Sequence, residues 1–149
     1  MTRKRDTEIF VLYSVNFIFR LFKCSLGLSD LHGDGRLHPK PGPGRPSGFG
    51  FELTFRLARE RGETTPPTWP ANVMQQLAKY VFNSGNTLMP GDHVSWHAPL
   101  DGGNGCITQI LMGQDPQLPT SISTPHGDVC AKNSRVFIKY DRFDDFQTR

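Results

Sequence analysis

The stretch GRPSGFGFELTFRL (residues 44–57) decides the fold, because apolar side chains alternate with other residues along most of its length. The apolar positions of this alternation are Phe49, Phe51, Leu53, Phe55 and Leu57. A period of two places every second side chain on the same face of an extended chain. The stretch therefore predicts a strand that begins at residue 48 or 49 and buries one face.

A helix is predicted next, in TPPTWPANVMQQLAKYVF (residues 65–82). Thr68 is a candidate cap, and Pro70 lies in the first turn, where its missing N–H costs nothing. An apolar stripe with helical spacing follows, made of Val73, Met74, Leu77, Ala78 and Val81. Residues 83–86, NSGN, tolerate left-handed backbone and end the helix. The stripe predicts that this helix packs on a sheet.

Two further strands are predicted after the helix. In GDHVSWHAPLD (residues 91–101), residues 93–97 alternate between apolar and polar side chains. The loop DGGNG (residues 101–105) then leads to CITQILM (residues 106–112), a third strand. Together these patterns predict an α+β fold with a mixed, mainly antiparallel sheet and a packed helix.

The composition indicates one turn-rich domain. The chain has 149 residues, of which 36% are hydrophobic, with 15 glycines and 12 prolines. The net charge of +3 arises partly from the basic cluster at residues 3–5, and no internal group of Lys and Arg interleaves with aromatic residues. We therefore expect no direct binding to nucleic acid. The cysteines fit neither a disulfide framework nor a CxxC metal site; they are Cys24, Cys106 and Cys130.

The N-terminal run IFVLYSVNFIFRLF (residues 9–22) follows the basic cluster and has the shape of a signal peptide or short membrane anchor. It is shorter than the roughly 20 residues of a spanning helix, and no small-x-small cleavage site follows. A secreted or anchored binding module stays open as an alternative. The interpretation favoured here assigns residues 1–25 to an unrelated, misfolded or disordered segment, with no membrane partner.

Asp92, His93 and His97 suggest a metal site, and with it the alternative of a small metal-dependent hydrolase. On a strand, however, residues four apart lie about 13 Å from each other. The chain also lacks the HExxH and CxxC metal patterns and the GxSxG nucleophile elbow. We therefore predict no catalytic residue, no metal, no cofactor and no small-molecule substrate.

Three aromatic residues invite a binding role. Trp69 and Trp96 lie next to predicted element boundaries, where large aromatic side chains usually anchor the core. Tyr80 projects from a neighbouring side of the helix if Leu77 faces the sheet. Its hydroxyl is then either at the rim of a site or simply half-buried.

Six blocks, in this order along the chain, resemble the Suppressor of fused family. They are GLSDLHGDGR (27–36), PSGFGFELTFRL (46–57), PPTWP (66–70), LAKYVF (77–82), GDHVSWHAPLD (91–101) and DPQ (115–117). The resemblance implies a regulator and not an enzyme. Suppressor of fused proteins are negative regulators of Hedgehog signalling that bind and sequester Gli/Ci zinc-finger transcription factors, in the cytoplasm and the nucleus.

The resemblance also implies a mode of binding. In the family, an N-terminal α/β lobe and a C-terminal lobe clamp an extended peptide of the transcription factor as an added strand. Tyr80 in LAKYVF and Asp92 in GDHVSW match positions that contact this peptide. Asp115 lies in a family position that is acidic, although the preceding residue is Gln114 where relatives have Glu.

The resemblance leaves both ends of the chain outside the family pattern. It implies a partial N-terminal lobe over residues 26–129, with a divergent charged tail over residues 130–149. The C-terminal lobe has no counterpart in the sequence. We therefore expect a truncated family member with an unrelated segment at each end.

Overall fold

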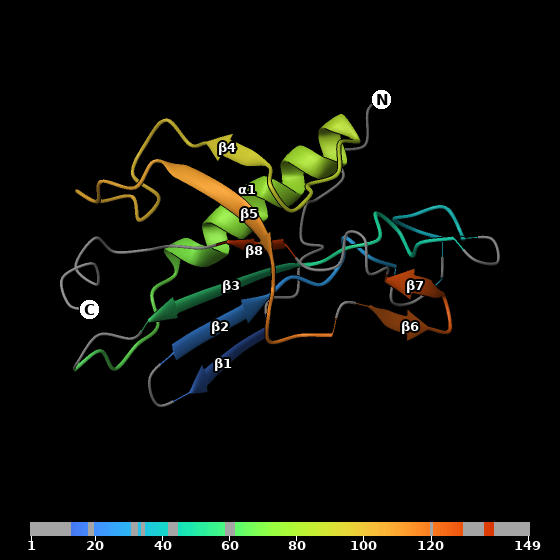
Figure 1. Cartoon of the computed structure of the whole chain (residues 1–149), viewed down its shortest axis with the longest axis horizontal. Coiled ribbons are helices and arrows are strands. Elements are labelled where there is room, and N and C mark those ends of the chain that lie inside the picture. Colours follow the sequence, from blue (N-terminus) through green and yellow to red (C-terminus); the bar gives the residue numbers. More distant parts are fainter. Residues whose placement is uncertain are drawn as a thin grey trace, which may run out of the picture.

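In the computed structural model of this chain, one helix lies against one face of a six-stranded sheet (Figure 1). The structure describes residues 13–17, 20–30, 33, 35–41, 45–58, 62–119, 121–129 and 136–138. The strands of this sheet, in the order in which they lie side by side, are β1 (Tyr13–Phe17), β2 (Arg20–Cys24), β3 (Leu53–Ala58), β8 (Val136–Ile138), β5 (Gln109–Gln114) and β4 (His93–Ser95).

The pairing within the sheet is antiparallel except between β3 and β8, which run parallel. A separate hairpin of β6 (Ile122–Thr124) and β7 (Gly127–Val129) lies to the right of the sheet in Figure 1. The predicted class, an α+β fold with a mixed and mainly antiparallel sheet and a packed helix, is confirmed.

Strand β3 begins at Leu53, four or five residues later than predicted. Gly48 (φ 55°) and Gly50 (φ 81°) both have left-handed backbone, so Phe49 lies in a turn between them. A side chain at Gly48 would also meet the carbonyl oxygen of Leu28 at 2.6 Å. The alternation of apolar side chains therefore continues through a turn that only glycines can form at these positions.

Helix α1 (Trp69–Ser84) agrees with the prediction, and the apolar stripe that the sequence predicted is buried. Gly85 ends it with left-handed backbone (φ 73°), and its N–H donates to the carbonyl oxygen of Val81. The prediction that Thr68 caps the helix is wrong, because its side chain makes no capping hydrogen bond.

The predicted strand over residues 93–97 ends at Ser95, because His97 adopts left-handed backbone (φ 58°). The strand predicted over residues 106–112 is β5, shifted toward the C-terminus. Both predictions placed the strand correctly and misplaced its ends, since apolar alternation continues into residues whose backbone leaves the sheet.

The structure differs from the expectation that residues 1–25 lie outside the fold. β1 and β2 form a hairpin whose second strand pairs with β3, from Arg20 opposite Ala58 to Cys24 opposite Thr54. Likewise β8, within the segment expected to be a divergent tail, lies between β3 and β5. Backbone pairing places these short strands, so a clear side-chain period is not required.

The core lies between α1 and the sheet. Its largest fully buried side chains include Phe51, Phe55 and Met74. The prediction that both tryptophans belong to the core is confirmed, since both are partly buried against it and the Trp69 ring meets Phe55 edge-on at 5.3 Å. Within the described ranges, no helix is both long and apolar enough to span a bilayer.

Candidate functional site

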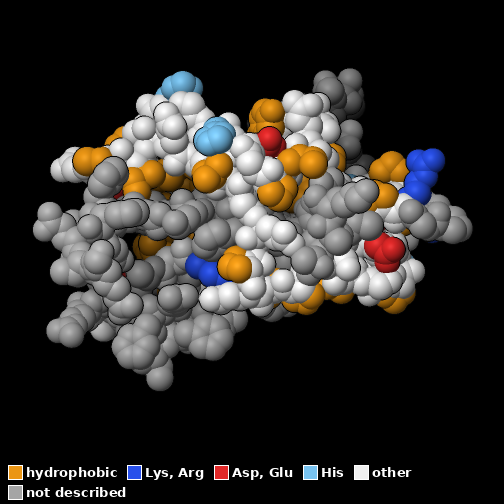
Figure 2. Space-filling model, viewed as in Figure 1, with side chains coloured by type: hydrophobic (Ala, Val, Ile, Leu, Met, Phe, Trp, Pro, Cys, Tyr) orange, Lys and Arg blue, Asp and Glu red, His pale blue; other side chains and the backbone are white. Residues whose placement is uncertain are grey.

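A cavity of about 820 Å³ opens between α1 and β4. We call it the α1–β4 groove. Its lining comes from three consecutive parts of the chain, α1 (Gln76, Leu77, Tyr80), the following loop (Thr87, Leu88) and the segment from Asp92 to His97. Figure 2 shows histidine, hydrophobic and acidic side chains at the surface in the region where β4 and α1 lie.

The backbone of β4 has one free edge, because β4 is the last strand of the sheet that the structure describes. Its other edge pairs with β5. Asp92 accepts a hydrogen bond from the N–H of Met112, and the N–H of Trp96 donates to Thr108, both at 2.8 Å. In an antiparallel pair, alternate residues face the partner, so the N–H and C=O groups of His93 and Ser95 point away from β5. These groups lie along the groove.

Tyr80 lies at the rim of the groove and is 48% exposed. It follows the buried Leu77 by three residues on α1, which places its ring beside the apolar stripe. Its hydroxyl oxygen accepts a hydrogen bond from Asn86 Nδ2 at 3.1 Å, just after the helix ends. This bond holds the ring in place and leaves the hydroxyl hydrogen available to a partner.

Asp92 lines the same groove, immediately before β4. Its Oδ2 accepts a hydrogen bond from the N–H of Met89 at 2.7 Å, which closes the turn that leads into the strand. The structure therefore brings Tyr80 and Asp92 together on one exposed groove. Their contact with a peptide stays a prediction.

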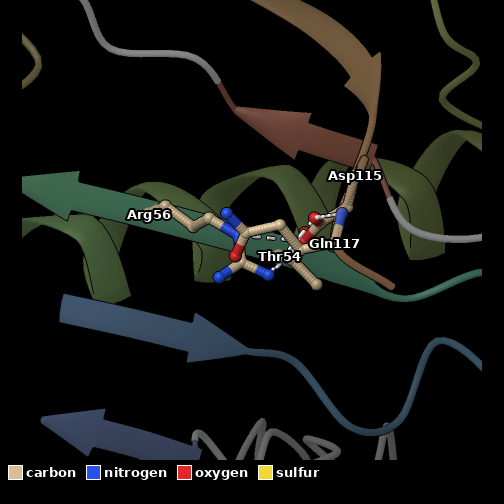
Figure 3. Close-up of polar contacts among 4 residues, drawn as sticks. All are labelled: Thr54, Arg56, Asp115 and Gln117. Carbon is tan, nitrogen blue, oxygen red and sulfur yellow. Dashed lines mark hydrogen bonds and ion pairs between the residues drawn. The ribbon is translucent and has the colours of Figure 1, made fainter. Parts of the chain in front are cut away.

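Asp115, the third predicted site residue, lies elsewhere (Figure 3). Its side chain is fully buried and forms an ion pair of 3.0 Å with Arg56. It also accepts hydrogen bonds from Thr54 Oγ1 and from the N–H of Gln117, each at 3.0 Å. The carboxylate thus ties the end of β5 to the polar face of β3. The structure does not bring it to the groove, and its contact with a peptide stays a prediction.

Glu52 is a polar residue whose role the sequence analysis missed. Burial raises the pKa of its carboxyl, and hydrogen bonds from the hydroxyls of Ser25 and Ser29 and from the N–H groups of Ser29 and Gly27 oppose that rise. These donors fix residues 25–29 to the start of β3. An acid within an apolar alternation is the signal that could have revealed it.

The metal-dependent hydrolase finds no support in the part of the chain that the structure describes. No three His, Cys, Asp or Glu side chains gather there as a metal site would require. His93 lies on a strand, and His97 lies beyond its end. The open face of this segment is instead a backbone edge beside a groove.

Comparison with known proteins identifies what this chain is similar to. A family model described as "Suppressor of fused protein" matches residues 21–132. The Suppressor of fused homologs of Homo sapiens and Mus musculus are each 59% identical to it over 105 residues. That alignment covers 70% of this chain and 22% of each relative, so the chain spans about a fifth of their length.

Two solved structures share the fold. The crystal structure of Drosophila Suppressor of Fused matches with a TM-score of 0.74 and 34% identity, over 90% of this chain and 34% of that one. The Sufu–Fu complex crystal structure matches with a TM-score of 0.72 and 35% identity, over 90% of this chain and 61% of that one.

Proposed function

We propose that this chain, which belongs to the Suppressor of fused family, is a negative regulator of Hedgehog signalling that binds and sequesters Gli/Ci zinc-finger transcription factors. The family consists of regulatory proteins and not of enzymes. The resemblance seen in the sequence is confirmed at this level. The partner, the activity and the cellular location, in the cytoplasm and the nucleus, are proposals for this chain.

The observation that carries the proposal is a free strand edge beside a groove. The outward N–H and C=O groups of His93 and Ser95 offer backbone partners to an extended peptide. Tyr80 and Asp92 lie on the same groove, where they meet the side chains of such a peptide. Strand addition of this kind obtains affinity from the main chain and selectivity from a few side-chain contacts.

Chemistry favours a peptide with a basic or donating side chain. Asp92 is the one acidic residue in the lining of the groove, and its carboxylate is exposed. A histidine in a Gli-type motif would donate to it. A relative of this chain has been crystallised in a complex with another protein, Fu, which supports protein binding as the general task of this fold.

The test is titration of a fluorescently labelled Gli/Ci peptide, followed by anisotropy. We expect Tyr80→Ala and Asp92→Arg each to weaken binding at least about tenfold, which corresponds to about 1.4 kcal/mol. Lys79→Ala is the matched control on α1, since Lys79 does not line the groove. Asp101→Arg is the second control, because Asp101 also accepts a turn hydrogen bond, from Gly103, away from the groove.

A further variant separates the charge of Asp92 from its role in the turn. Asp92→Asn keeps an oxygen for the N–H of Met89 and removes the negative charge. We expect it to fold normally and bind the peptide weakly. If the wild-type chain binds the peptide and all three groove variants bind as tightly, the groove is not the binding site.

A further inference from the structure

The two ends of the groove along β4 differ in chemistry. Asp92, at the start, is an exposed hydrogen-bond acceptor with a negative charge. His97, just beyond the end, is exposed and lines the same groove, and no second carboxylate does. An extended segment lying along the strand would therefore meet a carboxylate at one end and an imidazole at the other.

His97 has an unusual backbone. Among the described residues it is the only one other than glycine with positive φ, at 58°. Such a conformation costs free energy in a residue with a side chain, and it persists where the surrounding structure holds it. Here it ends the free edge of β4 and brings the imidazole back toward the strand, with Nδ1 lying 3.4 Å from Ser95 Oγ.

The contact with Ser95 gives the imidazole a direction. When the Ser95 hydroxyl donates to Nδ1, the proton of a neutral imidazole is on Nε2. Nε2–H is then a donor at the end of the groove. Asp92 and His97 thus form an acceptor and a donor at opposite ends of one strand edge.

We infer that the groove recognises the polarity of the bound strand, with a cationic or donating side chain opposite Asp92 and a carboxylate opposite His97. The inference rests on the proposed function and specifies the peptide further. The four residues from Asp92 to Trp96 span about 13 Å of extended chain. The two complementary side chains of the peptide therefore lie about four residues apart, which places them on the same face of it.

The test is a glutamate scan of the labelled Gli/Ci peptide, with each position replaced in turn, at constant salt. We expect one position, about four residues from the one whose change to Lys improves binding through Asp92, to tighten binding two- to fivefold. That is roughly the contribution of an exposed charged pair. In His97→Gly, which tolerates the left-handed backbone and lacks the imidazole, this gain should vanish.

His126→Gly supplies the matched control, since His126 does not line the groove and its removal should leave the gain intact. The inference is overturned if no glutamate position tightens binding, or if the gain survives in His97→Gly. In both cases the parent peptide would still bind in an Asp92-dependent manner, and the proposed function would stand. Failure of the parent peptide to bind the wild-type chain would instead overturn both.

Discussion

Glu52 is a carboxylate that the fold buries and surrounds with donors. Four hydrogen bonds reach it from Ser25, Gly27 and Ser29, all in the segment before the turn that leads to β3. Burial nevertheless dominates, and the pKa of the carboxyl is raised. Its protonated form is therefore favoured in the folded chain relative to the unfolded one.

This shift predicts a pH dependence of stability. Because the folded pKa lies above the ordinary value of 4.5, the stabilisation is fully present below that value and is lost as the pH rises through the folded pKa. Glu52→Gln removes the titration and keeps the shape. We expect the free energy of unfolding of wild type, minus that of Glu52→Gln, to fall as the pH rises above 4.5.

Urea unfolding of both proteins from pH 4 to 8 measures this difference. All other titrating groups are common to the two proteins, so they cancel to first order. A difference that stays flat, or that grows with pH, would show that the carboxyl is not destabilised by burial.

Arg56 and Asp115 form the second buried polar contact, and the two partners are not equivalent. The Asp115 side chain is fully buried, whereas the Arg56 side chain is 16% exposed and also covers the Phe22 ring at 4.5 Å. Removing Arg56 leaves a buried carboxylate without its cation. We expect Arg56→Ala to destabilise the chain by about 3 kcal/mol.

Asp115→Asn is the informative comparison. The amide oxygen can still accept hydrogen bonds from Thr54 and Gln117, and the Arg56 guanidinium can reach solvent. We therefore expect a smaller loss than in Arg56→Ala, measured by thermal or urea unfolding. Equal losses would mean that the charge of Asp115 is not what Arg56 stabilises.

At the scale of elements, β4 is short and has two different edges. One edge is paired with β5, and the other is free among the described residues. A free edge is a template for another strand. Because the sheet already satisfies the backbone of Val94, only the odd-numbered residues of β4 are available to a peptide.

Proline substitution tests the free edge directly. Ser95→Pro removes an outward N–H and keeps the pairing with β5, as edge strands tolerate. We expect the chain to fold and the affinity for the Gli/Ci peptide to fall at least about tenfold. Ser95→Ala, which keeps the N–H, is the matched control and should bind much more tightly. Equal affinity of the two variants would contradict strand addition at β4.

The elements differ in how far the sequence predicts them. α1 follows from its apolar stripe, and β3 from alternation, because both patterns are local. The ends of β3 depend on the left-handed turn at Gly48 and Gly50, which alternation does not reveal. β1 and β2 depend on a partner strand about 35 residues away in sequence, so no local period predicts them.

The candidate site shows the same division. Tyr80 and Asp92 came from a resemblance to a family, and their meeting on one groove depends on how α1 crosses the sheet. Asp115 has an acidic neighbourhood in sequence terms, yet its partner Arg56 lies 59 residues earlier. Only the folded chain distinguishes a carboxylate in a groove from one in the interior.

At the scale of the whole molecule, the arrangement presents one face and one edge for different tasks. α1 covers a face of the sheet and builds the core, while buried polar contacts connect β3 to β5 and to the segment before it. β4 remains at the side, next to the exposed end of α1 (Figure 1). The central claim is that a peptide joins the sheet there as an added strand.

Residue-resolved amide hydrogen exchange, measured by NMR with and without a saturating Gli/Ci peptide, tests this claim most directly. The account predicts that the amides of His93 and Ser95 become protected on binding. Val94 and Trp96, whose N–H groups already face β5, should change little. Binding of the peptide with no added protection at His93 and Ser95 would contradict the claim.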